Sequence, residues 1–118
     1  MKNTKTQNIA MLALLLFLSS NVFGQEYQSQ GKVASIVAAD VNLAGPDTDW
    51  VAVEGFTTAG SCGTDGTHVI MRLRDDSRGN RQLSIAMSAY MAGKTVLVSV
   101  DDTVKDASGS CFLRWLKL

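Results

Sequence analysis

The stretch RQLSIAMSAYMAGKTVLVSV, residues 81–100, decides the fold, because the period of its apolar residues changes partway along. From Arg81 to Ala92 they recur at helical spacing, which predicts a helix. Its apolar face is expected to consist of Leu83, Ala86, Met87 and Tyr90. From Lys94 to Val100 valines alternate with other residues, which predicts a strand. Gly93 stands between the two, at the position that glycine commonly takes after the end of a helix.

Four more segments are predicted to be strands, three before the helix and one at the end of the chain. Each contains β-branched or aromatic residues and is bounded by turn-forming residues. They are residues 32–40, 50–56, 68–74 and 110–118. Residues 25–30 are polar and are predicted to form a loose terminus. Ser77 or Asn80 is expected to cap the start of the helix.

Alternation within two of these strands separates an inward face from an outward face. In the third strand the predicted inward residues are Val69, Met71 and Leu73, and the outward residues are His68, Arg72 and Arg74. In the second strand the predicted inward residues are Val51 and Val53, and the outward residues are Trp50, Glu54 and Phe56.

The predicted order of elements is strand, strand, strand, helix, strand, strand. Five strands with a helix between the third and the fourth is the order of the OB-fold, a small, partly open barrel. We therefore expect a mainly β, OB-fold-like barrel with one helix, formed by residues 25–118 as a single domain.

Residues 1–24 are predicted to be a signal peptide. Lys2 and Lys5 form a basic start, an apolar run follows at residues 9–18, and Val22-Phe23-Gly24 precedes the expected cleavage point. The apolar run is shorter than the about 20 residues that cross a bilayer as a helix. No later apolar run is longer than a strand, so no integral membrane segment is expected. The mature chain is expected in the periplasm or outside the cell.

The charges of the chain argue against a nucleic-acid partner. The sequence has 11 Lys and Arg residues and 11 Asp and Glu residues. Loss of Lys2 and Lys5 with the signal peptide leaves a slight acidic excess, whereas proteins that bind nucleic acids usually carry a basic one.

Cys62 and Cys111 are the only cysteines. Two cysteines in an exported chain predict a disulfide between them. The alternative is a nucleophile pair of Cys62 with His68, six residues further along. Because no hydrolase, phosphate-binding or zinc-protease motif is present, we expect no catalytic residues and no enzymatic activity.

No metal ion or other cofactor is expected. His68 is the only histidine, and a metal site needs three or four ligands. Asp47 with Asp49, or Asp101 with Asp102, could hold a calcium ion weakly. The sequence lacks the regular run of acidic residues that forms a calcium loop, so both pairs are interpreted as solvated loop carboxylates.

The outward face of the third strand is the candidate binding surface. On an OB-fold the outer face of strands two and three commonly meets the ligand. Here that face would hold His68, Arg72 and Arg74, with Trp50 on the neighbouring strand. Aromatic rings beside arginines suit a sugar, a peptide or a single strand of nucleic acid. The alternative interpretation is an ordinary polar exterior with stray aromatic residues.

The layout of the chain resembles that of a known group of proteins. After the signal peptide come Gly31-Lys32-Val33, a glycine-rich loop with Cys62, the small-residue helix segment at residues 83–89, Gly93-Lys94-Thr95-Val96-Leu97-Val98, and Cys111 at the start of the last strand. This layout resembles small secreted proteins of Gram-negative bacteria and is similar to the binding subunits of pentameric toxins of the subtilase-cytotoxin and typhoid-toxin type. The resemblance implies an OB-fold with a disulfide, a glycan ligand and a homo-oligomer. It carries no sugar-contacting residue over to this chain.

These observations lead to two functional hypotheses. The first is a secreted, non-enzymatic binding module for a glycan or another ligand of a cell surface or envelope. The second is a small periplasmic protein that binds or inhibits another protein.

Overall fold

The computed structural model of the protein describes residues 24–38 and 49–118. The predicted signal peptide, except for Gly24, lies outside these ranges, and so does Asp47. The described part is mainly β with one helix. Its elements are β1 (Glu26–Val37), β2 (Trp50–Val53), β3 (Met71–Arg72), α3 (Ser77–Ala92), β4 (Thr95–Lys105) and β5 (Cys111–Lys117). The predicted order of elements, five strands with a helix between the third and the fourth, is therefore confirmed.

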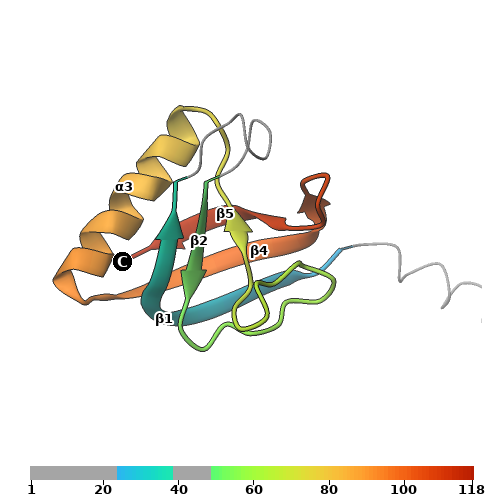
Figure 1. Ribbon diagram of the computed structural model, residues 1–118, viewed down its shortest axis with the longest axis horizontal. Coiled ribbons are helices and arrows are strands. Elements are labelled where there is room, and N and C mark those ends of the chain that lie inside the picture. Colours follow the sequence, from blue (N-terminus) through green and yellow to red (C-terminus); the bar gives the residue numbers. More distant parts are fainter. Residues whose placement is uncertain (1–23, 39–48) are drawn as a thin grey trace, which may run out of the picture.

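The five strands form one sheet that closes in a ring in the order β1-β2-β3-β5-β4 (Figure 1). All neighbours are antiparallel except β3 and β5, which run parallel. The helix α3 packs against β1, β5 and β4 on one side of the ring. The ring encloses a core of apolar side chains from every strand.

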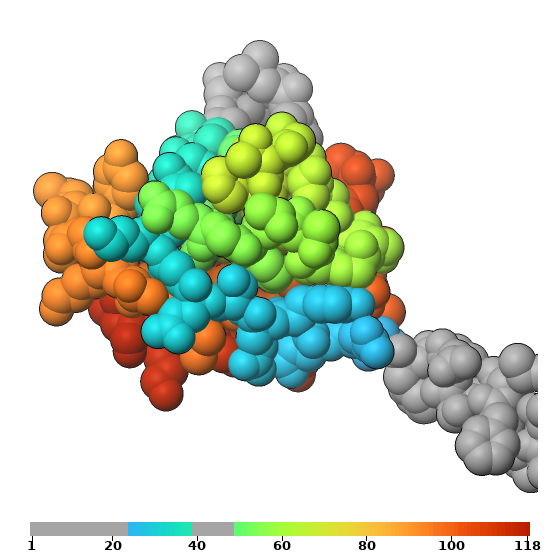
Figure 2. All heavy atoms as spheres, turned by 90° about the horizontal axis from the view of Figure 1, so that it is seen from below, coloured from blue at the N-terminus to red at the C-terminus, as the bar shows by residue number. Residues whose placement is uncertain are grey.

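The first strand is longer than predicted and closes the ring. Residues 26–32 pair with β4, and residues 33–37 pair with β2. The prediction that residues 25–30 form a loose terminus is wrong. Side chains here are mostly exposed or half-buried, so the segment shows no apolar alternation, and it is held by backbone pairing with β4. In Figure 2 the first half of β1 (blue) lies across the lower part of the face shown, beneath the loop that follows β2 (green).

The core confirms most of the predicted inward residues. Val51, Val53, Val69, Met71 and Leu73 are all buried, as are the alternating valines of β4. Phe56 is also buried, although it was expected to face outward with Trp50. The reason is that β2 ends at Val53 and the chain turns, with the amide of Phe56 donating to the carbonyl of Val53 at 3.2 Å, so the strand alternation no longer applies.

The helix begins earlier than predicted. It starts at Ser77, and the capping residue is Asp76, whose carboxylate accepts a hydrogen bond of 2.8 Å from the amide of Gly79. The expected caps Ser77 and Asn80 are both inside the helix. Gly79 is buried, and a Cβ at this position would overlap the carbonyl of Arg74, so the first turn lies directly against the preceding segment. The predicted end at Gly93 is confirmed, with a left-handed backbone at φ 65°.

The face that α3 turns to the sheet differs from the predicted one. Ala86 is buried and Leu83 partly buried, as expected, but Met87 and Tyr90 are exposed. Their places are taken by Gln82 and Ala89. Small residues at positions 86 and 89 let the helix backbone approach the sheet, and the side-chain amide of Gln82 donates to the carbonyl of Leu113 in β5 at 3.4 Å.

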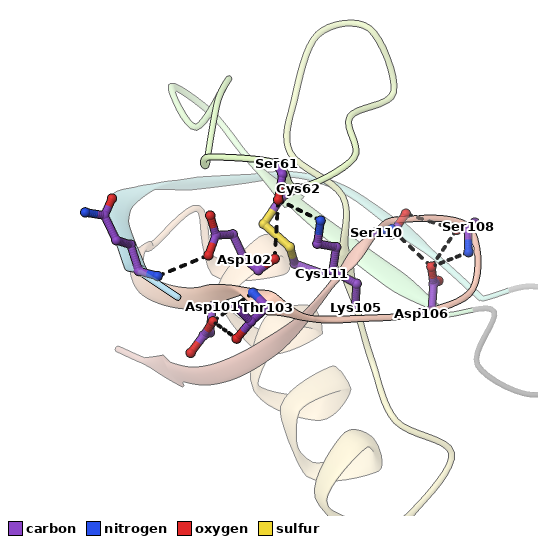
Figure 3. Close-up of a disulfide and its surroundings, with 11 residues drawn as sticks. Ser61, Cys62, Asp101, Asp102, Thr103, Lys105, Asp106, Ser108, Ser110 and Cys111 are labelled. Atoms are coloured by element: carbon purple, nitrogen blue, oxygen red, sulfur yellow. Dashed lines mark hydrogen bonds between the residues drawn. A yellow bond between two sulfur atoms is a disulfide. The ribbon is translucent and has the colours of Figure 1, made fainter. Parts of the chain in front are cut away.

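The predicted disulfide between Cys62 and Cys111 is present, with 5.2 Å between the Cα atoms (Figure 3). It joins the loop after β2 to the first residue of β5. The amide of Gly63 donates to the carbonyl of Gly109 at 2.9 Å, and the ammonium of Lys105 donates to the hydroxyl of Ser61 at 2.6 Å. Because Cys62 has no free thiol, it cannot form the alternative nucleophile pair with His68.

Candidate functional site

A row of three side chains crosses the outer face of the sheet. Trp50 of β2 is paired with Arg72 of β3, and Arg72 is paired with Phe112 of the parallel strand β5. Directly paired residues project to the same side of a sheet. The next row, Val51, Met71 and Cys111, is fully buried in the core, so the row with Trp50 faces outward. The structure thus brings together Trp50 and Arg72, as the sequence predicted.

Arg72 is fixed in place by the loop between β4 and β5. Its Nε lies 2.8 Å from Oδ2 of Asp106, and both side chains are only about 15% exposed. The other carboxylate oxygen of Asp106 accepts hydrogen bonds from the hydroxyl and amide of Ser108 and from the amide of Ser110 (Figure 3). Arg72 therefore connects the middle of the candidate surface to this loop through one carboxylate.

The electrostatics of this loop favour the ionised form of Asp106. Partial burial raises the pKa of the Asp106 carboxyl, but the hydrogen bonds from Ser108 and Ser110 and the positive charge of Arg72 outweigh that effect and hold the pKa below its ordinary value. The carboxylate of Asp106 is therefore charged at neutral pH, and its ion pair with Arg72 is maintained there.

Arg74 extends the row beyond β3. Its guanidinium carbon lies 4.2 Å from the centre of the Phe112 ring, which is within the range of a cation–π contact. Phe112 is almost fully buried, whereas Arg74 is exposed. The ring therefore supports the arginine from below, and the guanidinium keeps an open face toward solvent.

Beyond Arg74 the surface opens into a pocket of about 240 Å³ between the first half of α3 and the strands β4 and β5. We call it the arginine pocket. Its lining residues are Arg74, Arg78, Gln82, Asp101, Val104, Phe112, Leu113 and Arg114. Arg74 is the only one of these that sequence reasoning placed on the candidate binding surface, and Asp101 was considered only for a weak calcium site. The others come from three separate elements, and only the packing of α3 on β5 brings them together.

Arg114 connects this pocket to the start of β1. Its guanidinium lies 3.1 Å from Oε2 of Glu26. The other oxygen of Glu26 accepts hydrogen bonds from Ser99 at 2.6 Å, Gln28 at 3.1 Å and the indole of Trp115 at 3.3 Å. These hydrogen bonds, led by that of Ser99, and the charge of Arg114 hold the pKa of the Glu26 carboxyl below its ordinary value.

His68 is not part of the row. It lies in a turn before β3, where its amide donates to the carboxylate of Asp65 at 2.7 Å and its carbonyl accepts from the Asp65 amide at 3.0 Å. The predicted strand 68–74 is shortened to Met71–Arg72 because Val69 instead forms a bridge with Thr64. His68 therefore lies before the start of β3, outside the paired segment that carries Arg72.

Of the two acidic pairs considered for calcium, Asp47 lies outside the described residues, and Asp101 and Asp102 both accept hydrogen bonds. Asp101 accepts from the amide of Thr103 at 2.9 Å and from its hydroxyl at 2.6 Å, and Asp102 accepts from the amide of Gln25 at 3.1 Å. In the ranges 24–38 and 49–118, no group of three or more His, Cys, Asp or Glu side chains is placed to hold a metal ion.

Comparison of the chain with protein-family models, with curated proteins and with solved structures gives no match in any of the three. Within the described part of the chain, no helix has the length and apolarity needed to cross a membrane.

Proposed function

We propose that this chain is an exported, non-enzymatic binding module with an OB-fold, and that its ligand is a glycan. The OB-fold is supported by the order of strands in the ring, by the parallel pairing of β3 with β5, and by the single helix between β3 and β4. The ring has no other helix among the described residues that would cover the outer face of β2 and β3.

The observation that carries the proposal is the row of Trp50, Arg72 and Phe112 with Arg74 stacked on its end. Sugars present C–H faces that pack on aromatic rings and hydroxyl groups that bond to charged side chains. Trp50 offers an indole ring that is only partly buried, and Arg74 offers a guanidinium supported from below. Arg72 is held by Asp106, so it positions the loop rather than reaching freely for a ligand.

Export is supported by the residues at the start of the chain and by the cysteine chemistry. The basic start and the short apolar run have the composition of a signal peptide. Disulfides persist in the periplasm and outside the cell and are rare in the cytosol. The bond between Cys62 and Cys111 is compatible with that location.

A glycan array probed with the protein expressed through its signal peptide tests the proposed function. We expect binding to a subset of glycans and to no single-stranded DNA control. Trp50→Ala and Arg74→Ala should each weaken glycan binding at least fivefold with little change in the melting temperature. The matched control is Arg81→Ala, an exposed arginine on α3 that lines no part of the arginine pocket. Absence of binding to any glycan, with the protein folded, would refute the proposal.

A protein partner is the second candidate, favoured by the exposed side of α3. Met87, Tyr90 and Met91 are 48%, 58% and 84% exposed, and large apolar side chains grouped on a surface often mark an interaction site. Met91→Lys should then abolish co-purification of a partner from periplasmic extract while leaving the glycan array unchanged. The native mass of the purified protein tests the homo-oligomer that the resemblance implies.

A further inference from the structure

We propose that Asp102 is the binding site for the mature N-terminus, the α-ammonium group that signal-peptide cleavage after Gly24 creates on Gln25. In the uncut chain this nitrogen belongs to a neutral peptide bond, and cleavage turns it into a cation beside a carboxylate. The inference rests on the export part of the proposed function. It goes beyond that function because it links removal of the signal peptide to the stability of the ring.

The nitrogen of Gln25 lies against the carboxylate of Asp102. It donates to Oδ1 of Asp102 at 3.1 Å, and the amide of Asp102 donates to the carbonyl of Gln25 at 3.2 Å. The second of these bonds does not depend on the residue before Gln25, so it keeps the nitrogen in place when the preceding peptide bond is cut. A hydrogen bond between an ammonium and a carboxylate is roughly twice as strong as one between neutral groups. Cleavage should therefore strengthen a contact that the uncut chain makes weakly.

The carboxylate of Asp102 is held in position by the loop that follows β2. Its second oxygen, Oδ2, packs against Gly60, where an added Cβ would lie only 2.5 Å away. The hydroxyl of Ser61 donates to the backbone carbonyl of Asp102 at 3.3 Å, and Ser61 precedes Cys62 of the disulfide (Figure 3). A carboxylate fixed in this way loses little freedom when it pairs, which favours a measurable contribution from the ion pair.

The side chain of Gln25 is held as well. The hydroxyl of Tyr27 donates to Oε1 of Gln25 at 2.9 Å, and the Tyr27 ring is partly buried against the core. Gln25 is thus anchored through its nitrogen, its carbonyl and its side chain. The first residues of a chain are usually poorly ordered unless specific contacts tie them down. These contacts are present at the residue that the predicted cleavage would make the first.

The start of β1 is a segment that an added contact can stabilise. Residues 26–32 pair with β4, and the pairing of β1 with β2 begins only at Val33. The side chains of Glu26, Gln28 and Gln30 are exposed, so little apolar burial holds this segment. Terminal segments of this kind open locally before the rest of a fold does. An ion pair at Gln25 would oppose opening from the free end.

Gly24, the residue before the predicted cleavage point, is crowded in the folded chain. A Cβ there would overlap the side chain of Thr103 and lie 2.7 Å from Oδ1 of Asp101. Asp101 therefore places a second negative charge near the new cation. Because Glu26 is paired with Asp101 in β4, the bond between Gly24 and Gln25 lies next to the sheet. We expect cleavage to precede closure of the ring, since proteases cut exposed and unpaired chain most readily.

The ion pair should also protect Gln25 from a reaction typical of N-terminal glutamine. In that reaction the neutral α-amine attacks the carbon of the side-chain amide and forms a new N–C bond. The bond from this carbon to the amide nitrogen breaks, and ammonia leaves. The product is a cyclic lactam without a positive charge. A nearby carboxylate favours the protonated amine, which has no lone pair with which to attack.

The test compares two forms of the protein, made as fusions that a protease trims to begin at Gln25 or at Asn21. The longer form keeps the native residues before Gln25 and hence the peptide bond at its nitrogen. Each form is prepared, with the disulfide formed, as the native sequence, as Asp102→Asn and as Asp65→Asn. Asp65 is the matched control because it is an exposed aspartate that accepts hydrogen bonds from backbone amides of its own turn.

We expect the form that begins at Gln25 to melt about 2–5 °C above the longer form. Asp102→Asn should remove most of this difference, whereas Asp65→Asn should lower both forms equally. High salt should reduce the difference, because it screens partly exposed charges. Equal melting temperatures of the two native forms, or a difference that survives Asp102→Asn, would overturn the inference.

A second measurement follows the loss of ammonia from Gln25 by intact mass near pH 8, where part of the α-amine is neutral. The loss should be about threefold faster in Asp102→Asn than in the native sequence, and Asp65→Asn should not change it. An equal rate in Asp102→Asn and the native sequence would contradict an ion pair at this nitrogen.

The mass of the exported protein separates this inference from the glycan function. A first residue other than Gln25 would mean that the predicted cleavage, and this inference with it, is wrong, whatever the glycan array shows. A first residue Gln25 together with the expected melting differences would support the inference even if no glycan binds.

Discussion

Removal of the disulfide by the double substitution Cys62→Ala and Cys111→Ala should lower stability strongly. The two cysteines are separated by 49 positions in the sequence and are both buried. On the chain-entropy view, a closed loop of this length stabilises the folded state by about 4 kcal/mol, because it restricts the unfolded chain. For a domain of this size each kcal/mol moves the melting temperature by about 4–8 °C, so we expect a decrease of roughly 15–30 °C.

The loss of stability that follows removal of the disulfide should also affect the candidate binding surface. Cys111 is the residue before Phe112, which supports Arg74 and forms the floor of the arginine pocket. Without the bond, the start of β5 is held by its short parallel pairing with β3, by its bridge to Lys105, and by loop contacts such as that of Gly63 with Gly109. We expect ligand binding to weaken at temperatures well below the melting point of the variant.

Thermal unfolding followed by circular dichroism gives the measurement, with the reduced wild-type protein as the control. The variant and the reduced protein should melt at similar temperatures, both far below the oxidised protein. A variant that melts within about 5 °C of the oxidised protein would contradict the estimate of about 4 kcal/mol, because the loop contacts alone would then hold the segment.

Two further predictions concern the cap of α3 and the start of β1. Asp76→Ala removes the acceptor for the Gly79 amide and should cost about 0.5–2 kcal/mol in a denaturant titration, whereas Asp76→Asn should cost less. The pKa of Glu26 is lowered from 4.5 in the folded protein, first by the hydrogen bond from Ser99, so its contribution is present above pH 4.5 and is lost as the pH falls through the lower folded value. Melting temperatures measured from pH 7 to pH 2 should therefore fall less steeply in Glu26→Gln than in the wild type, and equal slopes would rule out this contribution.

Residues that alternate in polarity predicted the core well, because the sheet buries one face of each strand. The alternating valines of residues 96–100 and the inward residues Val69, Met71 and Leu73 are all buried. The first half of β1 could not be recognised in this way. Its segment Glu26–Gln30 is polar on both faces and is defined by pairing with β4, a partner more than 60 residues away in the sequence.

The helix shows where local patterns leave a choice open. Asp76, Ser77 and Asn80 are all residue types that cap helices, and sequence alone does not choose among them. The structure selects Asp76 because the close approach of Gly79 to Arg74 fixes the first turn. Likewise, Met87 lies within the apolar helical pattern, but the sheet accepts the small Ala89 instead.

The candidate surface was predicted in part. The pairing of β2 with β3 places Trp50 and Arg72 on the same face, as predicted. The sequence allowed this prediction because the alternation around both residues was recognised correctly. Arg78 and Arg114 form the arginine pocket with Arg74 although they are far apart in the sequence and belong to no motif. Only the packing of α3 against β5 shows that Arg78 and Arg114 line the same pocket.

The closed ring also limits how another molecule can be recognised. Each of the five strands has a neighbour on both sides, so no strand lies at the edge of the described sheet, although the first half of β1 is paired only with β4 and the second half only with β2. An extended peptide binds to many sheets by adding a strand, which requires unpaired backbone amides and carbonyls along an edge. Here that mode has only such partly paired segments to use, and under the proposed function we expect selectivity to come mainly from side chains such as Trp50 and Arg74. The identity of a few surface residues, rather than the backbone of the ring, would therefore decide which ligand a protein of this architecture accepts.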